Sequence, residues 1–137
     1  MNNFYVEWND IDKFVASLEL KTKYNYLIAI HRGGLVLGTI LSNKFDIPLI
    51  VIYSNPNSDE VDAKFFSNKS FLIVDDISDS GKTLKTVYDF FKKQENQTID
   101  TLCYCMKKTT TFIPTYYNIE TSIDKWIVFP WEYQNVK

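Results

Sequence analysis

The sequence predicts an α/β fold in which a mostly parallel β-sheet is flanked by helices. Short continuous apolar runs, typical of strands covered on both faces, alternate along the chain with segments whose apolar residues recur at helical spacing. Strands joined through helices in this way pair in parallel and use right-handed crossovers. The length of 137 residues is that of one ordinary domain, so we expect residues 1–137 to form a single domain.

The first elements expected along the chain are an edge strand, a helix and a buried strand. Residues 4–8 fit a short edge strand, and Asn9 or Asp10 is placed to cap the helix that follows. Residues 26–30 form a continuous apolar run that ends at the segment 31–34. The inward face of the helix is expected to consist of Ile11, Phe14, Val15 and Leu18.

A second helix and a second buried strand are expected after the glycine pair that closes the segment 31–34. Helical spacing of apolar residues begins at Leu35 and is broken by Pro48, which precedes a strand over residues 49–53. The polar stretch 54–69 is expected to be an exposed loop or a short hairpin. The apolar positions that define this helix are Leu35, Val36, Ile40 and Leu41.

The remaining regular elements are a strand over residues 71–74, a helix over residues 82–93 and a strand over residues 99–106. After Lys107 the regular alternation is lost, and an aromatic segment follows at residues 126–132. The inward face of the helix is expected to consist of Leu84, Val87, Phe90 and Phe91. Ligands of parallel sheets bind outside the carboxyl ends of the strands. The candidate site segments are therefore 31–34, 75–83 and the residues from Lys107 onward.

Composition and charge exclude several classes of function. The net charge is −2 and no Lys/Arg cluster is longer than two residues, so we expect no nucleic-acid partner. No apolar run is long enough for a membrane span and the N-terminus lacks a signal-peptide pattern, so we expect no integral membrane association and a cytoplasmic location. Fourteen lysines accompany one arginine, which makes Arg32 the sole guanidinium for bidentate anion binding.

The two cysteines, Cys103 and Cys105, are expected to be reduced core residues. They lie two positions apart in a strand-like stretch and point to the same face, which is poor geometry for a mutual disulfide. No second cluster of Cys or His accompanies them to complete a metal site.

Residues 75–83, Asp-Asp-Ile-Ser-Asp-Ser-Gly-Lys-Thr, combine two adjacent carboxylates with a small-residue turn that enters a helix. The turn at 80–83 offers free backbone N–H groups and the positive end of a helix dipole, which favour a phosphate. Asp75 and Asp76 suit hydroxyl groups or a hydrated Mg²⁺ instead. Sugar hydroxyls at one end and a phosphate at the other describe a ribose 5-phosphate.

Two known motifs with similar residues fail here. A P-loop that ends at residues 81–83 needs a glycine at the position of Asp76. An EF-hand that starts at Asp76 needs a glutamate where Val87 stands. A plain helix cap by Asp79 or Ser80 is the structural alternative for those two residues, but it leaves the rest of the string unexplained.

The segment 74–83 resembles the phosphoribosyl-pyrophosphate (PRPP) motif of type I phosphoribosyltransferases: an apolar strand, two acids, two residues, an acid, Ser or Thr, Gly, any residue and Thr. Residues 30–35, Ile-His-Arg-Gly-Gly-Leu, resemble the pyrophosphate loop of the purine enzymes. Lys107 and residues 126–132, Trp-Ile-Val-Phe-Pro-Trp-Glu, resemble the purine site of xanthine-guanine and archaeal hypoxanthine-guanine phosphoribosyltransferases. This resemblance implies the type I phosphoribosyltransferase fold, with a small C-terminal hood over the purine.

The resemblance also implies a role for each matching residue. Asp75 and Asp76 would bind the ribose hydroxyls and the Mg²⁺ shell, and Asp79 would be the catalytic acid or base beside the purine N7. Glu132 would reach a second metal ion. The residues that would hold the 5-phosphate are Asp79, Ser80, Gly81, Lys82 and Thr83. The pyrophosphate would meet Arg32, Gly33 and Gly34, and the purine would meet Lys107, Trp126 and the backbone of Ile127.

Three positions depart from the family pattern or invite a simpler reading. His31 stands where a small residue is usual, and we expect it to position the loop or merely to be tolerated. Trp131 is expected to pack rather than to bind a ligand. The stretch 54–69 is shorter than the mobile lid that the family usually carries before the acidic motif.

The function implied is transfer of ribose 5-phosphate from PRPP to guanine, xanthine or hypoxanthine with release of pyrophosphate, as in purine salvage. The resemblance implies Mg²⁺ as cofactor and a homo-dimer or homo-tetramer. The alternative is a weakly active or inactive regulatory module that retains affinity for PRPP or nucleotides, supported by the short stretch 54–69. A receiver domain also gathers two acids and a lysine, but it needs its acid pair after the first strand, not at 75 and 76.

Overall fold

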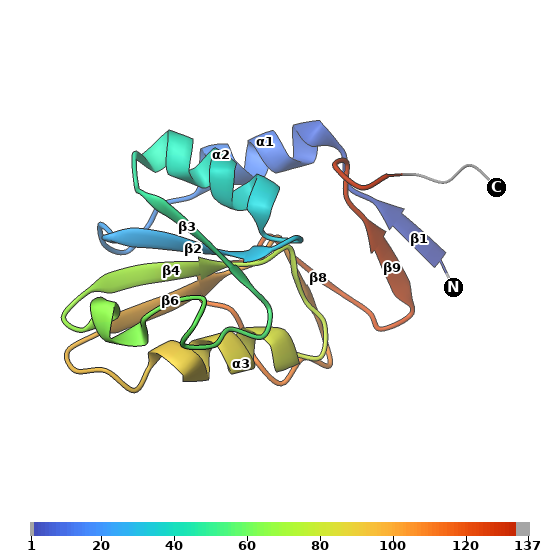
Figure 1. Ribbon diagram of the computed structural model, residues 1–137. Coiled ribbons are helices and arrows are strands. Elements are labelled where there is room, and N and C mark those ends of the chain that lie inside the picture. The colour runs from blue at the N-terminus through green and yellow to red at the C-terminus, as the bar shows by residue number, and fades with distance from the viewer. Residues whose placement is uncertain (1, 134–137) are drawn as a thin grey trace.

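A four-stranded parallel sheet forms the centre of the computed structural model, which describes residues 2–133 (Figure 1). Its strands lie in the order β3-β2-β4-β6, and every neighbouring pair is parallel. The predicted α/β class is therefore confirmed, and the carboxyl ends of all four strands lie at the same edge. The strands are β2 (Tyr26–His31), β3 (Leu49–Tyr53), β4 (Ser70–Val74) and β6 (Thr98–Leu102).

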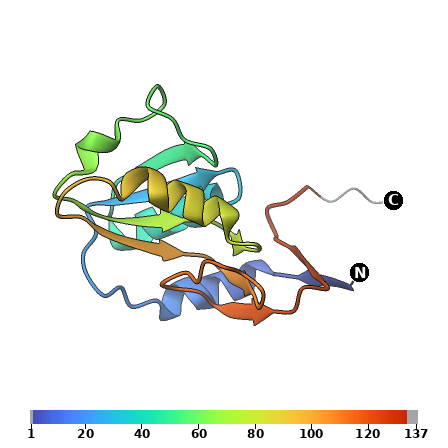
Figure 2. The same ribbon diagram turned by 90° about the horizontal axis from the view of Figure 1, so that it is seen from below.

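Helices cover both faces of this sheet (Figures 1 and 2). The helices α1 (Trp8–Ser17) and α2 (Leu35–Phe45) lie on one face, and α3 (Lys82–Phe91) lies on the other. Neighbouring residues of a central strand belong to opposite cores, as the two-residue period of a strand requires: Leu72 packs in the core beside α1 and α2, whereas Ile73 packs in the core beside α3. Continuous apolar runs were therefore the right signal for β2 and β4. The expected burial of strand 49–53 was wrong, because β3 lies at the edge of the sheet and its Val51 and Tyr53 are exposed.

The first helix begins two or three positions earlier than the sequence suggests. Glu7 is the N-cap of α1, and its N–H donates to the Asp10 carboxylate at 2.9 Å. The predicted cap by Asn9 or Asp10 was wrong, because Asp10 lies in the first turn and reaches back to the cap residue. The predicted edge strand 4–8 correspondingly shifts to β1, Asn2–Tyr5.

The stretch 54–69 contains an element that the sequence did not predict. A short 3₁₀ helix, η1 (Ala63–Phe66), lies beside α3, and Phe66 is only 1% exposed. The ring of Phe66 contacts those of Phe71 and Phe91 at centroid distances of 5.1 and 5.0 Å. An entirely exposed loop or hairpin was therefore wrong for this stretch, because its aromatic residue is needed to close the core over α3.

The predicted strand 99–106 is divided where the chain leaves the central sheet. Cys103 N–H donates to Tyr116 O and Tyr104 N–H donates to Asp76 O, each at 3.0 Å, so β6 ends at Leu102. The chain then enters a second parallel sheet of order β5-β7-β8, made of β5 (Ile77–Ser78), β7 (Cys105–Lys107) and β8 (Ile119–Thr121). Both cysteines are free and buried, as expected.

A two-stranded parallel ribbon, which we call the hood, joins the two ends of the described chain. It consists of β1 and β9 (Lys125–Val128), and Phe4 lies opposite Ile127 in its register. The ribbon extends from the body at the carboxyl edge of the central sheet (Figures 1 and 2). Within residues 2–133, none of the helices has the length and apolar character needed to cross a bilayer. The expected domain bounds include residues 1 and 134–137, which lie outside the described part.

Candidate functional site

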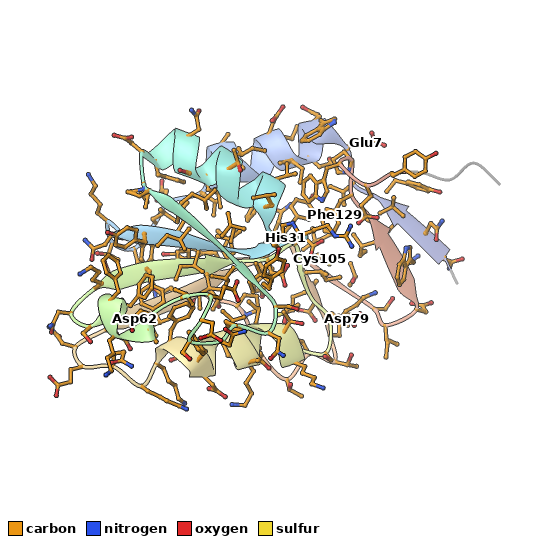
Figure 3. The ribbon with its side chains drawn as sticks, viewed as in Figure 1. Glu7, His31, Asp62, Asp79, Cys105 and Phe129 are labelled. Atoms are coloured by element: carbon orange, nitrogen blue, oxygen red, sulfur yellow. The ribbon has the colours of Figure 1, made fainter. Side chains whose placement is uncertain are left out.

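The three predicted site segments meet at the carboxyl edge of the central sheet. His31 ends β2, Asp75 and Asp76 follow β4, and Lys107 ends β7. Figure 3 shows the labelled His31 and Asp79 near this end of the sheet, on the side from which the hood extends. Because parallel strands all finish at one edge, segments far apart in the sequence lie together here.

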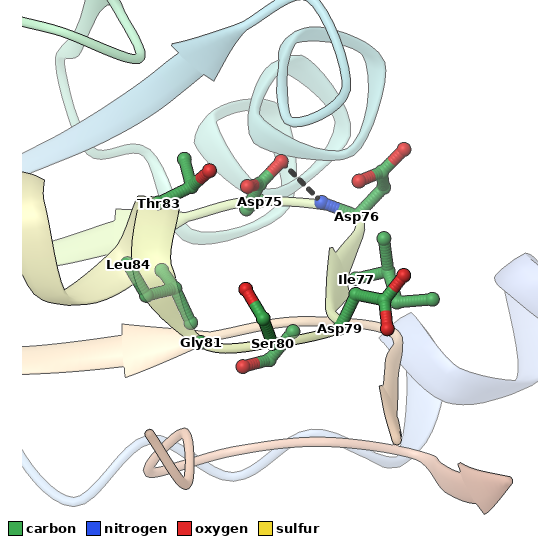
Figure 4. A pocket seen from close by; sticks show the side chains of 9 residues that line it. Asp75, Asp76, Ile77, Asp79, Ser80, Gly81, Thr83 and Leu84 are labelled. Carbon is green, nitrogen blue, oxygen red and sulfur yellow. Dashed lines mark hydrogen bonds between the residues drawn. The ribbon is translucent and has the colours of Figure 1, made fainter. Parts of the chain in front are cut away.

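Asp75 is buried and Asp76 is half-buried, and the two adjacent carboxylates repel each other when both are charged. Asp75 is 7% exposed, and its carboxylate accepts a hydrogen bond of 2.8 Å from the Asp76 N–H (Figure 4). Burial raises the pKa of Asp75 well above its ordinary value of 3.8, and the nearby Asp76 charge raises it further. Burial also raises the pKa of Asp76, although its hydrogen bonds oppose the rise. A cation or a set of hydroxyl donors would relieve this cost.

A cavity of about 240 Å³ separates the acidic pair from the turn that begins α3 (Figure 4). Gly81 caps α3 with a φ of 91°, a left-handed conformation that glycine adopts without strain. Lys82 N–H donates to Ser80 Oγ at 3.2 Å. Lys82 is exposed and does not line the cavity, unlike the other predicted phosphate residues. The lining consists of residues 75–81, Thr83 and Leu84.

A second cavity, of about 350 Å³, lies between this turn and the hood. Lys107 lines it and is 4% exposed, with its ammonium donating to the backbone oxygens of Ser122 and Lys125. Trp126, which is 58% exposed, borders the same space. The structure thus brings all three predicted purine residues together. The full lining is Asp76, Ile77, Asp79, Lys107, Ile123, Lys125, Trp126, Ile127, Phe129 and Glu132.

A third cavity, of about 500 Å³, lies beside the loop that follows β2. His31, Arg32 and Gly33 line it, and a Cβ added to Gly33 would lie 2.6 Å from an Asp76 carboxylate oxygen. A Cβ on Gly34 would lie 2.1 Å from the backbone oxygen of Val74, so Gly34 lets the loop pack against β4. The remaining lining residues are Leu35, Val36, Asp76, Trp131, Glu132 and Tyr133.

Asp76 is the common point of the three cavities, because it lines each of them. Asp79 lines the first and second cavities, and Glu132 lines the second and third. The arrangement can accept a ligand set that branches at one point: an anion at the helix turn, a flat group beside Trp126, and a second anion beside Arg32. The three cavities are lined largely by different segments of the sequence, and they adjoin one another at the residues that they share.

The carboxylates fit a magnesium ion that takes part of its shell from substrate and water. Within residues 2–133, no three His, Cys, Asp or Glu side chains lie close enough to form a ready metal site. Asp75, Asp76 and Glu132 therefore form no preassembled protein cage. One or two carboxylates completed by substrate oxygens and waters is the arrangement that Mg²⁺ prefers.

Sequence reasoning missed several residues that line the cavities. Ile123 and Lys125 border the second cavity, and neither carries a signal beyond its position in the irregular C-terminal segment. Phe129 faces the second cavity and Trp131 the third, and their rings stack in parallel at 4.9 Å and 6°. Trp131 also contacts Trp8 at 6.0 Å, which supports the packing role expected for it.

Comparisons with known proteins show which family this chain resembles. The family model described as phosphoribosyl transferase domain matches residues 9–135. The xanthine-guanine phosphoribosyltransferase of Vibrio atlanticus is 26% identical over 143 residues, covering 96% of this chain and 90% of that protein. The crystal structure of a purine phosphoribosyltransferase from Pyrococcus horikoshii Ot3 is 36% identical with a TM-score of 0.84, and the match covers 100% of this chain and 98% of that one.

A xanthine-guanine-hypoxanthine phosphoribosyltransferase from Helicobacter pylori shares the fold, with a TM-score of 0.75 at 19% identity over 95% of this chain and 90% of that one. The family match spans nearly the whole sequence, including the acidic turn, the loop after β2 and the aromatic C-terminal segment. This chain belongs to the phosphoribosyltransferase family and is a phosphoribosyltransferase enzyme of type I, similar to the purine-specific members.

Proposed function

We propose that this enzyme transfers ribose 5-phosphate from PRPP to guanine, xanthine or hypoxanthine and releases pyrophosphate. The observation that carries the proposal is the meeting of three cavities at Asp76, each with the chemistry of one part of this reaction. The names of the relatives from Vibrio atlanticus and Pyrococcus horikoshii support a purine substrate. The reaction places the protein in purine salvage.

The cavity between the acidic pair and α3 is suited to the ribose 5-phosphate. Asp75 and Asp76 accept hydrogen bonds from the ribose hydroxyls, and residues 79–83 surround the phosphate at the N-terminus of α3. Of these, Lys82 is the least direct, because its side chain is exposed, it does not line the cavity, and its N–H donates to Ser80 Oγ. Phosphate and hydroxyls are thereby held at opposite ends of one sugar.

The cavity beneath the hood is suited to the purine. The Lys107 ammonium uses two of its three donors on backbone oxygens, which leaves one for the oxygen at position 6 of the base. Trp126 offers a ring face for stacking, and the backbone of Ile127 meets the edge of the base.

The cavity beside Arg32 is suited to the pyrophosphate. Arg32 and the backbone of Gly33 bind its oxygens, while Gly34 lets the loop approach β4. Asp75, Asp76 and Glu132 contribute the protein ligands of Mg²⁺. The chemistry that Mg²⁺ supplies when bound is neutralisation of negative charge on the pyrophosphate oxygens.

In the reaction, N9 of the purine forms a bond to C1 of the ribose as the C1–O bond to pyrophosphate breaks. The electron pair of the broken bond leaves with the pyrophosphate, and Arg32 stabilises the charge that develops there. The proton lost by the base passes to Asp79, which lines both the sugar and the purine cavities. Asp75 and Asp76 hold the ribose so that C1 faces the base.

The second candidate function is a binding module that holds PRPP or a nucleotide without turnover. One observation favours it: η1 anchors part of the short stretch 54–69 in the core, so fewer residues remain to close over the site. We also propose a cytoplasmic location, a homo-dimer or homo-tetramer, and a single domain over residues 1–137.

One assay distinguishes the two candidates. The purified protein is incubated with PRPP, Mg²⁺ and, separately, guanine, xanthine, hypoxanthine or adenine, and nucleotide and pyrophosphate are measured. If the protein is a transferase, we expect product from at least one 6-oxopurine and little product from adenine. A double variant, Asp75→Asn with Asp76→Asn, should bind PRPP more than tenfold more weakly in the presence of Mg²⁺, which exceeds about 1.4 kcal/mol. PRPP binding without product from any base would favour the binding module.

A further inference from the structure

The phosphate turn, residues 79–83, is held from outside by the segment that follows Lys107. The backbone oxygen of Ser80 accepts two hydrogen bonds from Thr111, one from its N–H at 3.0 Å and one from its hydroxyl at 2.9 Å. Ser80 and Thr111 are both exposed, so little apolar burial accompanies this contact. Directed hydrogen bonds, rather than packing, therefore fix the turn at this point.

The neighbouring threonine secures the strand that leads into the turn. The Thr110 hydroxyl lies 2.8 Å from the hydroxyl of Ser78, which is 2% exposed and also donates to Phe112 O at 2.9 Å. A Cβ added to Gly81 would lie 2.8 Å from the Thr110 hydroxyl oxygen and 2.6 Å from Phe112 N. The turn and the segment 110–112 are thus in close contact, with no room for a side chain between them.

The segment 110–112 is also hydrogen-bonded to Lys107, the lysine that lines the cavity beneath the hood. Thr110 N–H donates to Lys107 O at 3.0 Å, and the Lys107 ammonium in turn holds the backbone oxygens of Ser122 and Lys125. Hydrogen bonds of Thr111, Thr110 and Lys107, which the chain itself links to one another, therefore connect the phosphate turn with the start of β9. They connect the cavity at the turn with the cavity beneath the hood.

We propose that Thr110 and Thr111 are positioning residues that hold the phosphate turn in its binding geometry and join it to the segment carrying Lys107. The proposal rests on the proposed function only for the identity of the ligands. The exposed part of the turn at Ser80 gains little rigidity from apolar packing, and fixing its backbone costs conformational entropy. Hydrogen bonds from Thr111 offset that cost before a ligand arrives, so that the N–H groups of the turn already face the phosphate.

The first test measures affinity for ribose 5-phosphate, a probe that lacks both the pyrophosphate and the base. Titration calorimetry compares the unmodified enzyme with Thr111→Val, Thr111→Ser and the control Thr109→Val. Thr109 is exposed, and its side chain makes no hydrogen bond to the described residues. We expect Thr111→Val to weaken binding about two- to tenfold, the loss typical of one hydrogen bond, and Thr111→Ser and Thr109→Val to leave it unchanged.

A kinetic comparison separates positioning from a general loss of structure. In Thr111→Val the KM for PRPP should rise while the KM for the base at saturating PRPP stays within about twofold of its original value, because one hydrogen bond is lost only at the turn. A merely structural role would instead lower the melting temperature and affect both substrates. Equal ribose 5-phosphate affinities in Thr111→Val and Thr109→Val would overturn the proposal.

A ligand-free measurement keeps the two proposals distinguishable. Amide hydrogen exchange over residues 79–83 should be faster in Thr111→Val than in Thr109→Val, and close to normal in Thr111→Ser. If the unmodified enzyme binds neither PRPP nor ribose 5-phosphate, the proposed function fails, and the exchange rates still decide whether the threonines hold the turn. Equal exchange rates in the two valine variants would show that they do not.

Discussion

Replacing Lys107 by methionine tests how the enzyme selects its base. The side chain is 4% exposed, and its ammonium already donates to the backbone oxygens of Ser122 and Lys125. An ammonium has three donors and no acceptor, so its remaining donor can meet an oxygen at position 6 of a purine. Adenine carries an amino group there, and two donors would then face each other. We expect the unmodified enzyme to use guanine far better than adenine.

The size of this preference follows from the burial of Lys107. An unmatched buried polar group costs about 1–3 kcal/mol, and at about 1.4 kcal/mol for each factor of ten this is roughly a 5- to 150-fold difference in kcat/KM. Lys107→Met should lower kcat/KM for guanine by about this factor and should not lower that for adenine, because the donor that faces the adenine amino group is removed as well. The backbone oxygens of Ser122 and Lys125 also lose a donor, but both residues are only partly buried, so we expect a stability loss of about 1 kcal/mol.

The assay is the ratio of kcat/KM for guanine to that for adenine in the unmodified enzyme, Lys107→Met and Lys108→Met. The ratio is informative because a looser contact between β7 and the start of β9 would lower kcat/KM for both bases by the same factor, and that factor cancels in the ratio. Lys108 is the matched control, since it is adjacent and exposed. Equal use of adenine and guanine by the unmodified enzyme, or a loss of preference in Lys108→Met instead of Lys107→Met, would refute the reasoning.

Three further predictions concern the acidic residues and the aromatic platform. Without Mg²⁺, the free energy of unfolding should fall as pH rises from about 4 to about 7, because the raised pKa of Asp75 lets the native state keep a proton that the unfolded chain loses above 3.8. In Asp75→Asn the free energy of unfolding, measured by urea unfolding at the two pH values, should fall less. An equal fall in the variant and the unmodified enzyme would contradict this prediction. Asp79→Asn should lower turnover by roughly 10²- to 10⁴-fold while PRPP binding persists in calorimetry, and normal turnover would leave Asp79 only a structural role. Trp126→Ala should weaken the binding of all purine bases by a similar amount, about 1–3 kcal/mol. A change in the order of base preference would argue against simple stacking.

The central strands and the third helix were predictable because their signals are local. The strand 49–53 has its predicted bounds, and the helix predicted from residue 82 begins there, after a glycine in the left-handed conformation. Apolar runs mark strands locally, but they do not say which strand lies at the edge of the sheet, and Val51 and Tyr53 of β3 are exposed there. The break after Leu102 has no such signal, since it depends on backbone partners at Tyr116 and Asp76 that only the folded chain supplies.

The candidate residues could be predicted, but their division among three cavities could not. Neighbouring residues of an extended chain point in opposite directions, so two adjacent aspartates need not serve one space. Asp75 lines the cavity at the phosphate turn alone, whereas Asp76 lines all three cavities and lies against Gly33. The pair therefore gives one carboxylate to the sugar cavity and one to the junction where sugar, base and leaving group meet. Burial in this place disfavours the charged form of both acids and so raises their pKa values. A cation bound at the junction would stabilise the charged forms and lower the pKa values again.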